Sequence, residues 1–440
     1  MPRAPIRRQR GIAALVVVMV LFFIISLVAA YTGRNLIFEQ RTSTNQYRAT
    51  QAFEAADAGI QWAIAMLNSG RIGANCQPSA NPADTSFRQR YLSIDPGNGF
   101  IKPTRADPED GVWPSCVFDG TTWACDCPTA APPALVAPAG AGPFPAFRVR
   151  FVKLGYAPPA PVLPDLGPDP TRPTIVRVEV NGCTLIDDNC LNFKLAPNAL
   201  AWRTCQATAC AQVALQSGLK STPAAAITVN GNLNVGGAAL TAFNSTPGTS
   251  GITIQAKGAV NRPALVLHGA PGTPPDRSVV ENDSGLVALT APRMFPSVFG
   301  VWRNTYWQQP AAVTMAPCVP CTAAGVRAVA ALNPGRVILV QGDLTLEGGG
   351  DIGTVADPVL VVVSGNITFT APTNIYGFVY SEALDWVTAG TGLIQGAAVA
   401  QGHISGTGSP TVVYDKPILD NLYWRTGSFV RVPGSWRDFP

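Results

Sequence analysis

The stretch RGIAALVVVMVLFFIISLVAAY, residues 10–31, decides the fold of this chain. The twenty residues from Ile12 to Tyr31 carry no charge. A helix of that length spans roughly 30 Å, the hydrocarbon thickness of a bilayer. The ten residues at the N-terminus contain four arginines and no acidic residue: Arg3, Arg7, Arg8 and Arg10. Because positive flanks stay in the cytoplasm, we expect a membrane helix with the rest of the chain exported.

The residues beyond the apolar run continue the helix. No proline occurs between Gly11 and Gln77. The pattern predicts one helix from Ile12 to about Asn68, roughly 85 Å long, with Gly70 placed to close it. Its first half would lie in lipid or against neighbouring copies, and its second half would pack on a globular domain. The predicted packing residues recur at helical spacing: Phe53, Ala56, Ile60, Ile64 and Leu67.

Two other interpretations of the N-terminus remain open. A cleaved secretory signal would use the small residues Val28, Ala29 and Ala30 as its cleavage site, although its apolar region is usually only about 7–15 residues long. A signal anchor followed by a plain stalk would show the same helical periodicity.

Two blocks in this helix resemble the N-terminal region of PilX-type minor pilins, RGIAAL at residues 10–15 and QAFEAADAG at residues 51–59. The resemblance implies cleavage by a prepilin peptidase between Gly11 and Ile12, and N-methylation of the new first residue. It also implies that the apolar helix is a membrane anchor and then a filament helix. The residues that would serve this role include Ile12, Leu15, Val16, Phe22, Phe23 and Leu27.

The chain departs from most pilins at one position. Where they carry a glutamate five residues into the mature helix, this sequence has Val16. A carboxylate in lipid is costly unless it is paired, and in pilins it is thought to pair with a neighbour's terminal amine. Its absence argues against a major subunit and suits a subunit at the tip, similar to the glutamate-lacking tip pseudopilins.

Two strand-like runs follow a loop-rich, proline-rich segment at residues 71–143. They are residues 146–153 (AFRVRFVK) and 174–180 (TIVRVEV). Both alternate apolar with charged residues, as half-buried antiparallel strands do. A helix packed on such a sheet is the architecture of a pilin head.

Short β runs and glycine dominate from about residue 225 onward. A weak motif recurs around Gly231, Gly342, Gly365 and Gly402, with apolar residues on both sides of each glycine. The spacing between Gly342 and Gly365 suits one coil of a β-solenoid. The pattern favours a solenoid-like domain, with a β-sandwich as the alternative. Within it, one predicted helix carries an aromatic stripe that we expect to pack on the solenoid: Phe295, Phe299, Trp302 and Tyr306.

The predicted fold class is therefore α+β, with a long N-terminal helix, an antiparallel pilin-like head and an all-β, solenoid-like domain. The predicted divisions are a leader (1–11), the helix (12–70), the head (71–182), a cysteine-containing connector (183–225) and the solenoid-like domain (226–440).

All cysteines lie beyond the apolar run, in a segment expected to reach an oxidising compartment, and their even number indicates disulfides. Cys183 with Cys190, and Cys205 with Cys210, are candidates for short local loops, but the spacing does not determine the pairing. Cys318 and Cys321 also have the spacing of a thiol oxidoreductase or half a zinc site, and a structural disulfide is the favoured interpretation. The candidates are Cys76, Cys116, Cys125, Cys127, Cys183, Cys190, Cys205, Cys210, Cys318 and Cys321.

Composition excludes several functions. Glycine and proline supply 82 of 440 residues, roughly 19% against a usual 12% or so, which argues against a coiled coil. Net charge is +4, and the four leader arginines account for all of it. A neutral body with a basic tip argues against nucleic acid as a partner. With two histidines, His268 and His403, a multi-histidine metal site is impossible. We expect both to be ordinary strand residues, and we expect no cofactor and no metal.

The serious enzymatic alternative is a β-solenoid that binds or cleaves polysaccharide. Asp343, Glu347 and Asp351 lie close together around a run of three glycines. These carboxylates could be ligands of a calcium ion. A calcium site needs six to eight oxygen ligands, so three carboxylates beside flexible glycines are weak support for a calcium site.

The favoured function is that of a minor pilin rather than an enzyme. Its helix would anchor it in the inner membrane with a periplasmic head and then enter an extracellular type IV pilus, at the tip, to prime assembly and display a large head. The resemblance implies as partners the prepilin peptidase, the major pilin, other minor pilins and, as an additional candidate, a large tip adhesin. A tip pseudopilin of a type II secretion system is the alternative within this class.

Overall fold

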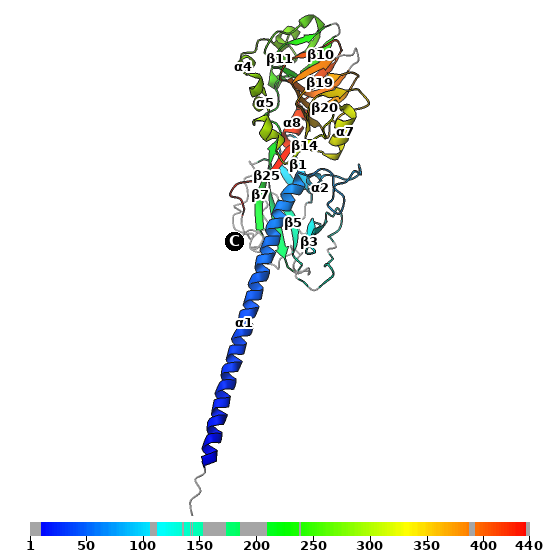
Figure 1. The fold of residues 1–440 in the computed structure, drawn as a ribbon. Coiled ribbons are helices and arrows are strands. Elements are labelled where there is room, and N and C mark those ends of the chain that lie inside the picture. The colour runs from blue at the N-terminus through cyan, green and yellow to red at the C-terminus, as the bar shows by residue number, and fades with distance from the viewer. Residues whose placement is uncertain are drawn as a thin grey trace, which may run out of the picture.

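The computed structural model describes residues 10–105, 112–133, 136–140, 142, 144–152, 173–184, 209–236, 239–386 and 392–436. Three parts follow one another along the molecule (Figure 1). A long helix forms a rod, its upper end enters a small β head, and a larger β domain sits on the far side of that head.

The rod is helix α1 (Arg10–Leu67), 58 residues without a break. The predicted single helix is confirmed, and it passes through Gly33, where a Cβ would meet no atom within 4 Å. The helix ends at Leu67, within one residue of the predicted end near Asn68, but the predicted cap at Gly70 differs. The Asn68 side chain exchanges two 2.8 Å hydrogen bonds with the backbone of Phe429, so a strand from the far end of the chain takes the place of a glycine cap.

The head is an antiparallel sheet in the order β25-β7-β6-β5-β3-β4. The two predicted strands form its central pair, β5 (Ala146–Val152) and β6 (Ile175–Cys183), with Val149 opposite Val180. The other strands are β3 (Ser115–Phe118), β4 (Trp123–Asp126), β7 (Ala209–Ser217) and β25 (Gly427–Arg431). Short elements within the loop-rich segment are α2 (Phe87–Tyr91) and the paired strands β1 (Leu92–Ile94) and β2 (Ile101–Pro103).

Small residues let α1 lie very close to this sheet. A Cβ on Gly59 would lie 2.5 Å from Val180 Cγ1 and 2.8 Å from a ring carbon of Phe147. On the sheet side, a Cβ on Gly182 would overlap the Ala52 carbonyl oxygen and lie 2.6 Å from the Ala56 nitrogen. Gly59 of the QAFEAADAG block is therefore needed for this close packing, since a larger side chain there would hold the helix away from the core of the head.

The upper domain is a solenoid of parallel strands, as predicted. Val337 pairs with Leu360, Leu360 with Phe378, and Phe378 with Ala397. The sequence offset from Val337 to Leu360 equals that of the predicted coil from Gly342 to Gly365. The longer interval from Gly365 to Gly402 contains two shorter coils. The long strands of these coils contain Gly377 and Gly396, whose φ values of 148° and 138° favour glycine. A Cβ at either position would overlap a carbonyl oxygen of the preceding coil.

The solenoid strands form two parallel sheets. The first begins with β14 (Ala312–Thr314), β16 (Val337–Val340), β18 (Val359–Val363), β20 (Asn374–Ser381) and β22 (Leu393–Ala400). At β22 the sheet divides into two branches. One branch contains β24 (Thr411–Tyr414), β10 (Leu240–Phe243) and β12 (Leu265–His268), and the other contains β8 (Ile227–Val229), β11 (Ile254–Ala256) and β13 (Val279–Val280). The second contains β15 (Cys321–Thr322), β17 (Leu344–Leu346), β19 (Asn366–Phe369), β21 (Ala383–Trp386), β23 (Ile404–Gly406) and β9 (Leu233–Val235).

The solenoid is inserted between two neighbouring strands of the head. The chain leaves at Ser217, the end of β7, and returns at Gly427, which pairs with that same residue. Residues 227–280 form the coils farthest from the head, and residues 312–414 stack from the head outward to meet them, where β22 pairs with both β24 and β8. Figure 1 shows β10 and β11 at the outer end and β14 near the head.

This insertion changes two predicted boundaries. β7 lies inside the predicted connector 183–225, and β25 lies inside the predicted solenoid-like domain 226–440, yet both are head strands. Antiparallel pairing of Gly427–Arg431 with Val213–Ser217 brings them together. A local motif search does not detect such a pairing, because the whole solenoid lies between the two strands in the sequence.

Helices flank the solenoid (Figure 1). They are α4 (Ser284–Val287), α5 (Ala291–Phe299), α6 (Arg303–Trp307), α7 (Ala323–Leu332) and α8 (Lys416–Arg425). The predicted aromatic helix is in fact two helices, broken at Gly300, whose φ is 79°. Phe295, Phe299 and Tyr306 pack on the solenoid as expected, and both phenylalanine rings contact Tyr380. The fourth stripe residue differs, because Trp302 follows the break and is 57% exposed.

One buried arginine joins the rod, the head and the solenoid. The Arg88 guanidinium donates to the carbonyl oxygens of Leu67 at 2.8 Å, Gly335 at 2.9 Å and Gly427 at 3.1 Å. Leu67 is the last residue of α1, so the cation also meets the negative end of a helix dipole. Burial lowers the pKa of Arg88 to about 9, which leaves it charged at neutral pH. Its carbon Cζ lies 5.1 Å from the centroid of the Phe429 ring.

We predict that Arg88→Met lowers the free energy of unfolding by about 3 kcal/mol or more, because it leaves several buried carbonyls without their charged donor. Arg88→Lys should recover only part of the loss, since an ammonium group lacks the planar fork of donors. Urea unfolding of the full chain in detergent measures this, with exposed Lys102→Gln as the control. A wild-type midpoint for Arg88→Met would contradict the assignment.

We also predict that Gly59→Ala destabilises the head although alanine favours helices by about 1 kcal/mol, because overpacking costs about 1–3 kcal/mol. Gly33→Ala is the matched control within the same helix, since its Cβ meets nothing, and it should leave head stability unchanged. Thermal unfolding followed by near-UV circular dichroism distinguishes the two. Equal melting curves for both variants would be incompatible with the close helix–sheet contact.

Candidate assembly surface and the predicted sites

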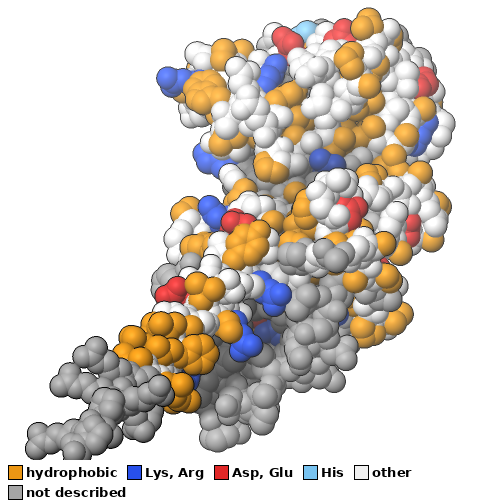
Figure 2. Space-filling model, turned by 60° about the horizontal axis from the view of Figure 1, so that its bottom comes forward, with side chains coloured by type: hydrophobic (Ala, Val, Ile, Leu, Met, Phe, Trp, Pro, Cys, Tyr) orange, Lys and Arg blue, Asp and Glu red, His pale blue; other side chains and the backbone are white. Residues whose placement is uncertain are grey.

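The first half of α1 extends away from the head and the solenoid (Figure 1). Between Ala14 and Thr50 every residue is exposed, and the helix is long and apolar enough to cross a bilayer. Figure 2 looks toward this end of the molecule, where hydrophobic side chains cover the helix. The predicted membrane or filament residues have large exposed fractions: Leu15 62%, Val16 53%, Phe22 72%, Phe23 70% and Leu27 60%. An apolar surface of this extent needs lipid or protein to cover it.

Charge divides the exposed helix into two zones. From Ala14 to Gly33 it carries no charged residue, and the first ones beyond are Arg34, Glu39 and Arg41. Tyr31, at the boundary, is 66% exposed, and aromatic and basic residues together are typical of a membrane interface. Position 16 is a valine, and the apolar zone contains no carboxylate that would need a charged partner.

The predicted processing bond lies at the start of this helix, since α1 already includes Gly11 and Ile12. The side chain of Ile12 lies outside the described residues, as does the leader up to Gln9.

The second half of α1 docks on the head through the predicted face. Ala56, Ile60 and Leu67 are buried, and Ile64 is half-buried against the same core. Phe53 differs, because it is 39% exposed and contacts the C-terminal tail instead, with its ring 5.9 Å from that of Trp436.

The partners of this tail were not predicted from the sequence. Trp436 Nε1 donates a 3.2 Å hydrogen bond to Asp57 Oδ1, across 379 positions of sequence. Gly59 and Gly182 were missed as well. The small-residue spacing around Gly59 was a usable signal, whereas nothing near Trp436 in the sequence points to Asp57.

Disulfides cross-link the head, one between two loop residues and one between the paired strands β3 and β4. Cys76 bonds to Cys127 and Cys116 to Cys125. Cys183 and Cys210 are also disulfide-bonded, while the other members of the predicted short loops, Cys190 and Cys205, lie outside the described residues.

The CxxC pair of the solenoid forms a disulfide between Cys318 and Cys321. The next helix, α7, starts only at Ala323, with Thr322 as its N-cap. Cys318 therefore does not sit at a helix N-terminus, which is where a redox-active first cysteine usually gains its low pKa.

The three carboxylates of the glycine-rich corner each satisfy a different local group. Asp343 accepts a 2.8 Å hydrogen bond from the Asn366 nitrogen. Glu347 accepts one of 3.1 Å from the Ala323 nitrogen, and Asp351 accepts one of 2.9 Å from the Asn374 amide. They join neighbouring coils, and within the described residues no group of three potential metal ligands occurs.

The two histidines are exposed strand or corner residues. His268 is the last residue of β12, with its ring 5.6 Å from that of Phe243. His403 lies between β22 and β23, and its carbonyl oxygen accepts a hydrogen bond from Leu384.

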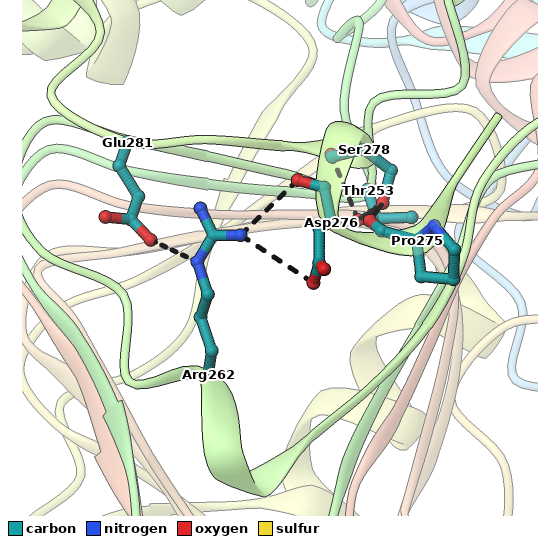
Figure 3. A network of polar contacts seen from close by, with 6 residues as sticks. All are labelled: Thr253, Arg262, Pro275, Asp276, Ser278 and Glu281. Atoms are coloured by element: carbon teal, nitrogen blue, oxygen red, sulfur yellow. Dashed lines mark hydrogen bonds and ion pairs between the residues drawn. The ribbon is translucent and has the colours of Figure 1, made fainter.

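A polar network holds the outer coils together (Figure 3). Arg262 Nε lies 2.7 Å from Glu281 Oε1, and its Nη1 lies 3.8 Å from Asp276 Oδ1. Beside it, the buried hydroxyls of Thr253 and Ser278 are 2.8 Å apart. Ser278 Oγ also donates to the Pro275 carbonyl oxygen in the same turn. The buried Thr253–Ser278 contact links segments 25 residues apart, whereas the exposed ion pairs of Arg262 contribute little.

Comparison with known proteins identifies the N-terminal segment. Residues 10–61 match the family model of the PilX N-terminal region, which confirms the resemblance in the sequence and includes both of its blocks. No curated protein sequence matches the chain. Among solved structures, the crystal structure of the competence-associated pilin ComZ from Thermus thermophilus aligns over 89% of this chain and 97% of its own, with 12% identity and a TM-score of 0.23. An alignment this loose carries no argument.

Proposed function

Because its N-terminal region is that of the PilX-type minor pilins, we propose that this protein is a minor pilin of a type IV pilus. It is anchored in the inner membrane with a periplasmic head after cleavage between Gly11 and Ile12 and methylation of Ile12. It then enters the extracellular filament. The proposed partners are the prepilin peptidase, the major pilin, other minor pilins and a large tip adhesin.

The bare, apolar half of α1 carries this proposal. A surface with side chains more than half exposed, such as Val16, Phe22 and Leu27, is stable only where lipid or other apolar helices cover it. A subunit that exchanges lipid for neighbouring helices uses the same surface in both places. The proposed mechanism is thus assembly without catalysis.

Two features support a position at the tip. The solenoid extends beyond the head, on the side away from the rod (Figure 1), where a further subunit of a filament would need room. Val16 also lacks the carboxylate that would pair with a neighbour's terminal amine. At the tip, the subunit would prime assembly and present the solenoid to the outside.

We predict that purified pili contain this polypeptide starting at methylated Ile12, by mass spectrometry of its N-terminal peptide. Val20→Asp should reduce its amount in pili at least tenfold, because a charge inside an apolar helix costs about 2.5–3.5 kcal/mol. Val355→Asp is the matched control, since Val20 is 52% and Val355 53% exposed, but Val355 lies on the solenoid. It should enter pili normally.

A mature chain that starts at Tyr31, or a Val20→Asp variant present in pili at the wild-type level, would refute the proposal. Recovery of the protein from a secretion pseudopilus instead of pili would identify it as a tip pseudopilin.

A further inference from the structure

A small pocket on the outside of the solenoid contains an arginine, Arg303. The pocket encloses about 330 Å³ and is lined by Pro292, Phe295, Trp302, Arg303, Asn304 and Gln401. That volume lies within the range of small-molecule sites. Within the described residues, no carboxylate lies within ion-pair distance of Arg303.

The Arg303 guanidinium is held in place by neutral groups. Its Nη2 donates a 2.9 Å hydrogen bond to Gln401 Oε1. Its Cζ lies 5.4 Å from the centroid of the Phe295 ring and 5.9 Å from that of Trp307. An arginine fixed this way loses little side-chain entropy when it binds an anion, and its remaining donors form the planar fork that matches a carboxylate.

The amide of Gln401 is oriented by a second donor. The Tyr380 hydroxyl donates to the same oxygen, Gln401 Oε1, at 3.0 Å. Burial raises the pKa of Tyr380, so its hydroxyl keeps its proton and remains a donor. With Oε1 occupied by two donors, the Gln401 amide nitrogen is left as a donor on the pocket lining, beside the exposed amide of Asn304.

Trp302 completes the pocket with an exposed aromatic ring. It is 57% exposed although its neighbours Phe295 and Tyr306 are buried. Tryptophan combines a large apolar surface with few rotatable bonds, so it contributes to binding at a low entropic cost. An exposed ring beside a guanidinium held by neutral groups and two amides suits a ligand with an apolar face, several hydroxyls and one negative charge.

We propose that this pocket binds an acidic sugar residue of a polysaccharide, with its carboxylate on Arg303, its hydroxyls on Asn304 and Gln401, and its ring on Trp302. The inference deepens the proposed function, on which it rests for the display of the solenoid outside the cell. Binding itself is testable on the isolated protein, so either idea can fail without the other.

The test is calorimetric titration of the full chain in detergent with a galacturonate trimer, and with maltotriose as the uncharged probe. We expect binding of the acidic trimer at least tenfold tighter than that of maltotriose. Trp302→Ala and Arg303→Gln should each weaken it at least tenfold, and Arg303→Lys should recover part of the affinity. Arg277→Gln is the matched control, an exposed arginine outside the pocket, and should bind as wild type does.

Several results would overturn the proposal. They are no binding of the acidic trimer by the wild type, unchanged affinity in Trp302→Ala or Arg303→Gln, or equal affinity for maltotriose. Equally effective competition by acetate would show a general anion site instead of a sugar site. Melting curves for each variant separate a lost pocket from a lost fold, and Trp302→Ala removes a mostly exposed side chain, so it should fold normally.

Discussion

The guanidinium of Arg88 is the contact on which the arrangement of the whole molecule depends. It binds the last carbonyl of α1, the loop before β16 and the first residue of β25, which belong to the rod, the solenoid and the head. A buried cation without an acidic partner would be costly. Here oriented carbonyl dipoles, including a helix C-terminus, take the place of a carboxylate. Asn68 reinforces the same junction through its two bonds to Phe429.

The insertion of the solenoid explains why this junction must be rigid. Two strands, β7 and β25, carry the chain into and out of the whole solenoid, and they are hydrogen-bonded neighbours. Any force on the solenoid therefore reaches the head sheet through paired strands and through α7, whose Leu332 carbonyl oxygen accepts a 2.8 Å bond from the Arg71 nitrogen. A large domain held in this way can be displayed at a fixed angle to the rod.

The functional proposals concern opposite ends of the molecule and rest on different physics. The rod has an apolar surface that lipid or neighbouring helices must cover. The free energy gained by covering it depends on the buried area and not on particular contacts. The pocket at Arg303 depends on a few positioned donors and one ring. We therefore propose assembly at one end of the molecule and recognition at the other.

The sequence by itself determined the elements whose signals are local. Twenty uncharged residues and a proline-free helical repeat predict α1, alternation predicts β5 and β6, and the glycine-centred motif predicts parallel coils. Tertiary structure decided what depends on distant partners: the return of β25 to β7, the bond between Trp436 and Asp57, the capping of α1 by Asn68, and the exposure of Trp302 after the break at Gly300. Periodicity reports which face of an element is apolar, but not which other segment will cover it, because that choice depends on pairing between distant parts of the chain.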